Sequence, residues 1–120
     1  MSENGHLCPE NGEELLTVRM SRKVEWVDLP ELAEATDGKW NGVYVRTLNG
    51  HEMDKYKGST VSKDGSKLEW TNISARFAVV ACCNKNAEPL FTEKNIPVLA
   101  SNWHGATLDR IWDTGSKLNR

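Results

Sequence analysis

The stretch from Asn72 to Cys83 constrains the fold of this chain more than any other part of the sequence. From Phe77 onward it holds seven consecutive apolar or soft residues, and no other stretch is apolar for as long. Alanines at 75, 78 and 81 favour a helix, whereas the β-branched Val79 and Val80 favour a strand. The length of the segment and its polar end at Asn84 favour a helix of about three turns, capped by Thr71 or Asn72. Because this helix is apolar nearly all round, we expect it to lie at the centre of the fold.

Two β-strands are predicted upstream of this central helix. Val24–Leu29 alternates imperfectly and stops at Pro30, and Val43–Arg46 alternates with β-branched residues. The connection between them carries the turn signals Asp37-Gly38 and Asn41-Gly42, with a short helical turn at Glu31–Ala35. It is too short for a crossover helix, so we expect the two strands to pair antiparallel.

A short helix is predicted between the second strand and the central helix. Asn49 and Glu52 have the spacing of a capping box, Met53 and Tyr56 share one face, and Gly58 closes the helix. A polar loop at 59–67 and then Trp70 lead into the central helix.

After the central helix, the sequence predicts a polar turn over Asn84–Pro89, from which Leu90 and Phe91 return to the core. Thr92 can cap a short helical segment, but Pro97 lies where that helix would need an amide. The final residues, Gly105–Leu118, form an amphipathic pattern whose apolar stripe continues to the end of the helix.

The predicted fold is therefore α+β: a small single domain with an antiparallel two- or three-stranded β element packed with three to four α-helices. Residues 1–20 are acidic and polar, with the breakers Cys8-Pro9 and Asn11-Gly12, which predicts a flexible leader. Within that leader, Glu13–Val18 is the part that could order against the body. Met20 is a second candidate translation start, and residues 21–120 form the folded domain.

Composition excludes several classes of function. The formal net charge is −2 with acids and bases interspersed, which gives no electrostatic case for nucleic acid. No apolar run approaches the ~20 residues of a membrane span, and no secretory signal is recognisable, which points to the cytoplasm. Three cysteines, two of them adjacent, do not form a disulfide framework.

Enzymatic and metal-binding chemistry find little support in the sequence. A cysteine hydrolase would need Cys82 or Cys83 beside His104, but thiols buried in an apolar helix have raised pKa values and are inert. A zinc site from Cys82, Cys83, His104 and either His6 or Cys8 lacks the usual spacing of the cysteine ligands. We expect no catalytic residues, no metal and no cofactor.

Three sequence blocks carry a resemblance to a known family. The first is V-Y-V-R-T-L-N-G-H-E-M-D at residues 43–54, preceded by the strand that ends at Pro30-Glu31. The second joins A-R-F-A-V-V-A-C at 75–82 to E-P-L-F-T at 88–92, and the third is L-D-R-I-W at 108–112 with Leu118-Asn119. In this order and spacing they resemble the tail assembly chaperones of long-tailed, siphovirus-type bacteriophages, from Val24 to Asn119.

That resemblance implies a non-enzymatic protein that binds the long, largely helical tape measure protein while subunits of the tail tube protein assemble around it. It also implies action in the host cytoplasm and absence from the finished virion, and it leaves room for self-association. An extended amphipathic chain exposes apolar stripes that aggregate. A chaperone covers them with an apolar groove or helix face.

On the basis of this resemblance, the candidate partner-binding residues lie in and just before the terminal helix: Trp103, Leu108, Ile111, Trp112 and Leu118. Aromatic side chains are favoured interface anchors. Core packing is the alternative for each tryptophan, because a small domain needs large side chains to bury. The rival function is a small structural virion component, such as a head–tail or tail-tube connector.

Overall fold

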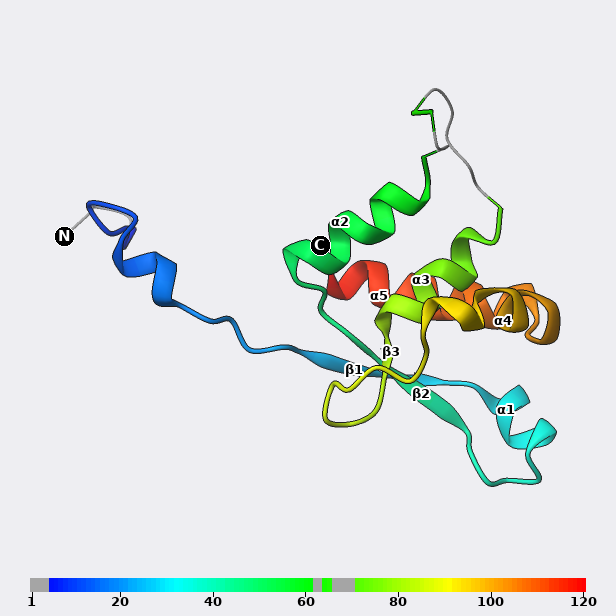
Figure 1. Ribbon diagram of the computed structural model, residues 1–120. Coiled ribbons are helices and arrows are strands. Elements are labelled where there is room, and N and C mark those ends of the chain that lie inside the picture. The colour runs from blue at the N-terminus through cyan, green and yellow to red at the C-terminus, as the bar shows by residue number, and fades with distance from the viewer. Residues whose placement is uncertain (1–4, 62–63, 66–70) are drawn as a thin grey trace.

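The structure is a computed structural model that describes residues 5–61, 64–65 and 71–120. Its centre is an antiparallel three-stranded sheet in the order β1 (Val24–Asp28), β2 (Gly42–Arg46) and β3 (Cys82–Cys83). The α-helices are α1 (Pro30–Ala35), α2 (Gly50–Ser59), α3 (Ile73–Ala81), α4 (Ile96–Asn102) and α5 (Gly105–Leu118), and two 3₁₀ helices are η1 (Glu14–Thr17) and η2 (Glu93–Asn95). Helices α2 to α5 gather on one side of the sheet, and α1 lies at one end of β1 and β2 (Figure 1).

The predicted α+β class is confirmed. The described part of the chain has five α-helices, one more than the upper end of the prediction, because the short turn expected at 31–35 is a helix, α1. Its first residue is Pro30, whose fixed φ suits the first helical position and whose missing amide is not needed there. The polar loop predicted at 59–67 falls partly, and Trp70 entirely, outside the described residues.

The predicted antiparallel pairing of the first two strands is confirmed, with Val27 opposite Val43 and Trp26 opposite Tyr44. Val27 and Val43 are buried, and α5 packs on this face of the sheet. Trp26 and Tyr44 form an edge-to-face pair on the other face, with ring centroids 5.0 Å apart. The sheet thus has one core face and one face where aromatic side chains reach solvent.

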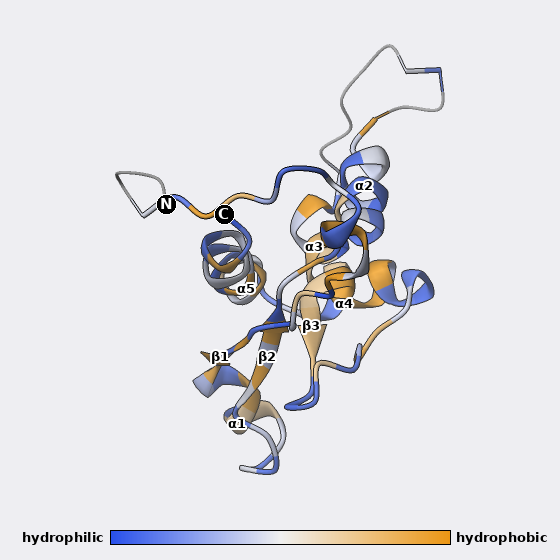
Figure 2. Ribbon diagram, turned by 90° about the vertical axis from the view of Figure 1, so that its left-hand side faces the viewer, coloured by the Kyte–Doolittle hydropathy of each residue, from blue (hydrophilic) through white to orange (hydrophobic). Residues whose placement is uncertain are grey.

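The central helix ends two residues earlier than predicted. Cys82 has extended backbone angles (φ −67°, ψ 131°), and Cys82 and Cys83 pair with Val45 and Tyr44 of β2 as strand β3. The prediction that both cysteines are helical was wrong. Buried backbone amides and carbonyls of β2 need partners, and a segment that leaves the helix directly beside the sheet provides them. Figure 2 shows β3 as an apolar strand below the helices.

The start of α3 also differs from the prediction. Asn72 occupies the N-cap position in the left-handed region (φ 56°), and its side chain caps no amide. Asparagine tolerates this left-handed conformation better than most residues, which explains why Asn72 can occupy the position without a capping hydrogen bond.

The core forms where α3 and α5 cross above the sheet. Phe77, Ala78 and Ala81 of α3 are buried with Leu108 and Ile111 of α5. The predicted bounds of the terminal helix, 105–118, are confirmed. Gly115 permits the close approach of the two helices, because a Cβ at this position would lie 2.5 Å from the ring of Phe77.

The segments on either side of the central helix follow the predicted signals, with three differences. The Asn49–Glu52 capping box is confirmed, but α2 continues through Gly58 to Ser59. Leu90 is exposed, so only its neighbour packs against the core. Pro97 does not interrupt a helix: it lies in the first turn of α4, where its missing amide costs nothing.

Residues 5–21, here called the arm, extend away from the helices and the sheet (Figure 1). Glu13–Val18 contains a helical turn, η1, closed by hydrogen bonds from Leu15 and Leu16 to Gly12. These side chains are exposed, so the turn is not packed against the body as the sequence had allowed. No helix in the described ranges is long and apolar enough to cross a membrane.

Candidate functional site

A groove of about 850 Å³ runs between α2 and the segment from Pro89 to the start of α4, with α3 behind it. Its apolar surface comes from five residues of different elements: Tyr56, Val79, Val80, Phe91 and Ile96. Its charged residues come from β2, α2, α3 and η2: Arg46, Glu52, Lys55, Arg76, Glu93 and Lys94. A concave apolar surface bordered by charges fits an amphipathic segment of another chain better than it fits a small polar substrate.

Three of the five apolar residues of the groove are left half covered by the core: Val80, Phe91 and Ile96. Phe91 and Val80 are half-buried, and Phe91 packs edge-to-face on Trp103 with ring centroids 6.1 Å apart. Lys55 of α2 reaches Glu93 of η2 at 2.6 Å, across the groove. Both side chains are mostly exposed, so this ion pair stabilises the fold very little and can be exchanged for another partner.

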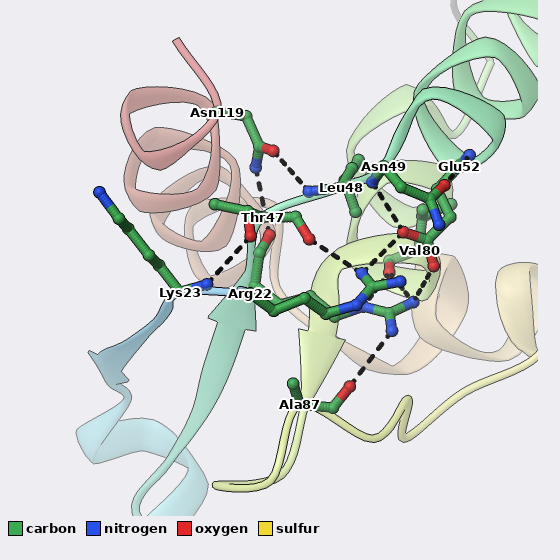
Figure 3. A network of polar contacts seen from close by, with 10 residues as sticks. Arg22, Lys23, Thr47, Leu48, Asn49, Glu52, Val80, Ala87 and Asn119 are labelled. Atoms are coloured by element: carbon green, nitrogen blue, oxygen red, sulfur yellow. Dashed lines mark hydrogen bonds and ion pairs between the residues drawn. The ribbon is translucent and has the colours of Figure 1, made fainter. Parts of the chain in front are cut away.

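Arg46 and Glu52, which line the groove, belong to a polar network (Figure 3). The Arg46 guanidinium is buried and donates to the carbonyl oxygens of Val80 and Ala87 and to the carboxylate of Glu52, at 3.1–3.2 Å and 2.8 Å. It therefore joins β2 to α3, to the turn after β3 and to α2. A buried guanidinium with partners for its donors specifies one arrangement of these elements.

Glu52 links this network to the start of the folded domain. Its carboxylate accepts from Arg22 at 2.7 Å and from the amide of Asn49 at 3.0 Å, in addition to Arg46. Burial raises the pKa of Glu52, but the hydrogen bond from Arg22, the Asn49 amide and the two guanidinium charges together bring the pKa below its ordinary value. The carboxylate is therefore ionised at neutral pH and holds Arg22, at the root of the arm, against α2.

Arg76 on α3 also lines the groove. Its guanidinium donates to the carbonyl oxygens of Ser59, at the end of α2, and of Thr71, just before α3. Arg46 and Arg76 thus both link α2 to α3 beside the groove.

The residues in and just before the terminal helix that were predicted to bind a partner do not form one surface. Leu108 and Ile111 are buried in the core, where they contact other residues of this chain, so they offer no contact area in this state. Leu118 is half-buried and packs against the core. Trp112 keeps 39% of its surface exposed, although its ring packs on Phe77 with centroids 4.8 Å apart.

Trp103 lies at a second, smaller hollow of about 470 Å³ between α1 and the start of α5. Glu31 accepts from the Thr107 hydroxyl at 2.9 Å and pairs with Arg110, which ties α1 to α5. Glu34 and His104 also line this hollow. Trp103 and Trp112 therefore lie at different places, and neither borders the groove.

Cys82 and Cys83 are both buried, where they pair with β2 as strand β3. Burial raises the pKa of the Cys82 thiol to about 12, so this thiol stays protonated at neutral pH. Burial also raises the pKa of Cys83, although the charges of Arg46 and Arg22 oppose that rise. In the described ranges, no three His, Cys, Asp or Glu side chains cluster closely enough to hold a metal ion.

Sequence reasoning missed the groove because no single element carries it. The signals that could have indicated it are Arg46 at the buried end of a strand and Glu52 six residues later. An arginine at such a position needs a carboxylate partner, and Glu52 was interpreted only as a capping residue.

Three comparisons with known proteins were made, and one of them found a protein of similar fold. No protein-family model matches the chain, and no curated protein sequence matches it either. Among solved structures, the chain is similar to the tail assembly chaperone of bacteriophage HK97, with a TM-score of 0.59 and 15% sequence identity. The similarity covers 88% of this chain and 90% of the other. The resemblance expected from the three sequence blocks is thus confirmed at the level of the fold.

Proposed function

We propose that this chain is a non-enzymatic bacteriophage tail assembly chaperone, which binds the tape measure protein and promotes assembly of the tail tube. The observation that carries this proposal is the similarity in fold to the HK97 chaperone over almost the whole of both chains. The three sequence blocks support it independently, because they occur in the same order as in that family. We place its action in the host cytoplasm, before the virion is complete.

We propose the groove as the main tape measure site. Two of the three sequence blocks, at 43–54 and at 75–82 with 88–92, supply Arg46, Glu52, Val80 and Phe91 to its lining. An amphipathic helix could place its apolar stripe on Phe91 and Ile96 and its charged flanks beside Lys55 and Lys94. The exposed edge of Trp112 stays as a second proposed contact, and Trp103 as a third.

The test is a pull-down of the tape measure protein from the same phage, after co-expression with variants of the full chain. Phe91→Ala and Ile96→Ala shorten groove residues, and Val98→Ala is the matched control because Val98 is an exposed apolar residue of the same helix, α4, outside the groove. We expect the groove variants to lose binding by roughly tenfold or more each and the control to bind normally. Each variant is also melted, so that loss of folding is not taken for loss of binding.

Trp112→Ala, compared with Lys117→Ala on the same helix, tests the second contact in the same assay. Normal binding by all groove variants, with loss for Trp112→Ala alone, would move the site to α5. Mass spectrometry of purified virions tests the assembly role. A chaperone is absent from them, whereas many copies per particle would favour the structural virion component instead.

We also propose that residues 21–120 form the folded domain and that residues 1–20 are dispensable for folding. Trypsin should cleave first after Arg19, which lies on the exposed arm. The product that starts at Met20 should then melt at nearly the same temperature as the full chain. A drop of more than a few degrees would show that the leader contributes to the fold.

A further inference from the structure

Strand β1 lies at the edge of the sheet, with β2 as its neighbour on one side only (Figure 2). At one end of the ladder to β2, the amide of Thr47 donates to the carbonyl of Lys23 at 2.9 Å. At the other end, the amide of Leu29 donates to the carbonyl of Asn41, also at 2.9 Å. Hydrogen-bonded pairs in an antiparallel ladder recur at every second residue, so the odd-numbered residues of β1 face β2.

The even-numbered residues of β1, Val24, Trp26 and Asp28, therefore point their amides and carbonyls away from the sheet. No backbone hydrogen bond reaches these groups from residues 5–61, 64–65 or 71–120. They recur about every 6.8 Å, as the outward groups of any other strand do. β1 also lacks the proline, lysine or bulge with which many edge strands avoid pairing. The partner that fits these groups is thus an extended backbone.

Beside this edge, Trp26 forms an apolar surface on the outer face of the sheet. It keeps 42% of its surface exposed, and Val24 keeps 37%. Two neighbours fix the indole: Tyr44 packs edge-to-face on it, and Gly42 lies so close that a Cβ there would overlap the ring. A side chain held in this way loses little conformational entropy when a partner covers it. This surface therefore suits the β-branched side chains of a strand laid along β1.

The charges along β1 decide which strand fits best. Glu25 and Asp28 are exposed, and neither forms an ion pair within the described part of the chain. They give residues 24–28 a net charge of −2. A second copy of β1 would bring four carboxylates together along one edge, which disfavours that pairing. A strand with lysine or arginine opposite the two carboxylates is favoured instead.

We propose that the free edge of β1 is a docking site for an extended, positively charged segment of another protein, which adds to the sheet as a fourth strand. In the antiparallel orientation, a basic residue lies opposite Asp28, and β-branched residues lie opposite Trp26 and Val24. A second basic residue lies opposite Glu25, on the other face of the sheet. None of these four residues lines the groove, so the two sites are separate. The inference goes beyond the proposed function and does not depend on it.

The probe is the peptide Thr-Lys-Thr-Val-Arg-Val-Thr with blocked ends, which places these side chains in order along β1. Methyl groups on its third and fifth amide nitrogens block the edge that faces away from β1, so the peptide cannot pair with itself. The control peptide carries the methyl groups on its fourth and sixth amides, which face β1. Each peptide is titrated into the full chain and followed by NMR. We expect the first peptide to shift the amides of Val24, Trp26 and Asp28 more than those of the residues between them, and the control peptide not to bind.

Variants of the chain test the edge from the other side. Val24→Pro removes an outward amide without removing a bond of the ladder to β2, and Val24→Thr is the matched control that keeps this amide. We expect the proline variant to bind the peptide about tenfold more weakly and the threonine variant to bind it normally. A melt of each variant shows whether the strand is still folded.

A charge reversal tests the choice of partner. Glu25→Lys/Asp28→Lys should also weaken binding of the peptide by about tenfold or more. A peptide with glutamate in place of its lysine and arginine should then bind this variant and not the original chain. Both positions are exposed, so the melting temperature should stay close to that of the original chain.

Two outcomes would overturn the proposal. One is that the two methylated peptides behave alike, because the free edge would then not be used. The other is that the amides of Val24, Trp26 and Asp28 are protected from hydrogen exchange in the chain alone, since the arm or a second copy would then already cover the edge. Sedimentation equilibrium distinguishes those two occupants. Failure here leaves the tape measure experiment unaffected, because that experiment depends on the groove.

Discussion

Replacing Phe77 with alanine removes the side chain at which three helices meet. Its ring packs edge-to-face on Tyr56 of α2 and on Trp112 of α5, with centroids 5.4 Å and 4.8 Å away, and only 2% of the residue is exposed. On a third side, the ring lies against the bare backbone at Gly115. The variant therefore leaves a cavity inside the core instead of a dent on the surface.

The cost follows from this geometry. Truncation of a buried phenylalanine to alanine destabilises proteins by about 3–5 kcal/mol, and the value depends on how far the site can collapse. Here α3 is fixed by β3, and α5 is fixed where Asn119 bonds to the backbone of Arg46 and Leu48. Little collapse is therefore available, so we expect about 4–5 kcal/mol, which for a domain of this size lowers the melting temperature by about 20 °C.

Thermal unfolding followed by circular dichroism measures this, with Phe91→Ala as the control. The control removes the same atoms from the half-buried wall of the groove, where solvent fills the space, and should cost about 1–2 kcal/mol. If the two variants melt at the same temperature, Phe77 is not the centre of the core, and the packing described between α3 and α5 is incorrect.

Three further outcomes are expected. Glu52→Gln should destabilise the chain more at pH 7 than at pH 3 in urea unfolding. A carboxyl whose pKa is lowered in the folded state contributes stability above its ordinary pKa of 4.5, and this stability is lost as the pH falls through the lowered pKa. An equal effect of the substitution at both pH values would contradict the ion pairs of Glu52. Gly115→Ala should cost about 1–3 kcal/mol through its clash with the buried phenylalanine ring, whereas Gly58→Ala, with open space around it, should be neutral or slightly stabilising. A thiol reagent should modify the exposed Cys8 rapidly and Cys82 only after unfolding.

The sequence predicted those elements whose signals are local. The terminal helix has the bounds given by its stripe, and the first two strands and the capping box at Asn49 were found because alternation and capping depend on neighbours in the chain. The end of the central helix was not found. Alanine and valine at the end of this segment are compatible with a helix or a strand. The strand forms because the backbone of β2, about 40 residues upstream, needs hydrogen-bond partners.

The candidate site was harder to predict for the same reason. Ile111 is buried, whereas its neighbour Trp112 on the same helix is partly exposed. This difference depends on how α3 packs against α5, which the sequence of α5 does not reveal. The groove depends on four elements, so no periodicity in any one of them reveals it. Phe91 was expected to return to the core, and it does so only partly, which is what leaves it available at the groove.

The direct passage of α3 into β3 has a consequence for the motions of the molecule. Cys82 is at once the residue after the last helical turn, with its amide bonded to Ala78, and the partner of Val45 in the sheet. The helix and the strand therefore form one continuous segment, so that neither can unfold without the other. Amides from Phe77 to Cys83 should exchange with solvent only when the whole domain unfolds, while α2 and η2, which rest on side-chain contacts, can open in smaller steps. One wall of the groove is thus a rigid reference against which the opposite wall can move.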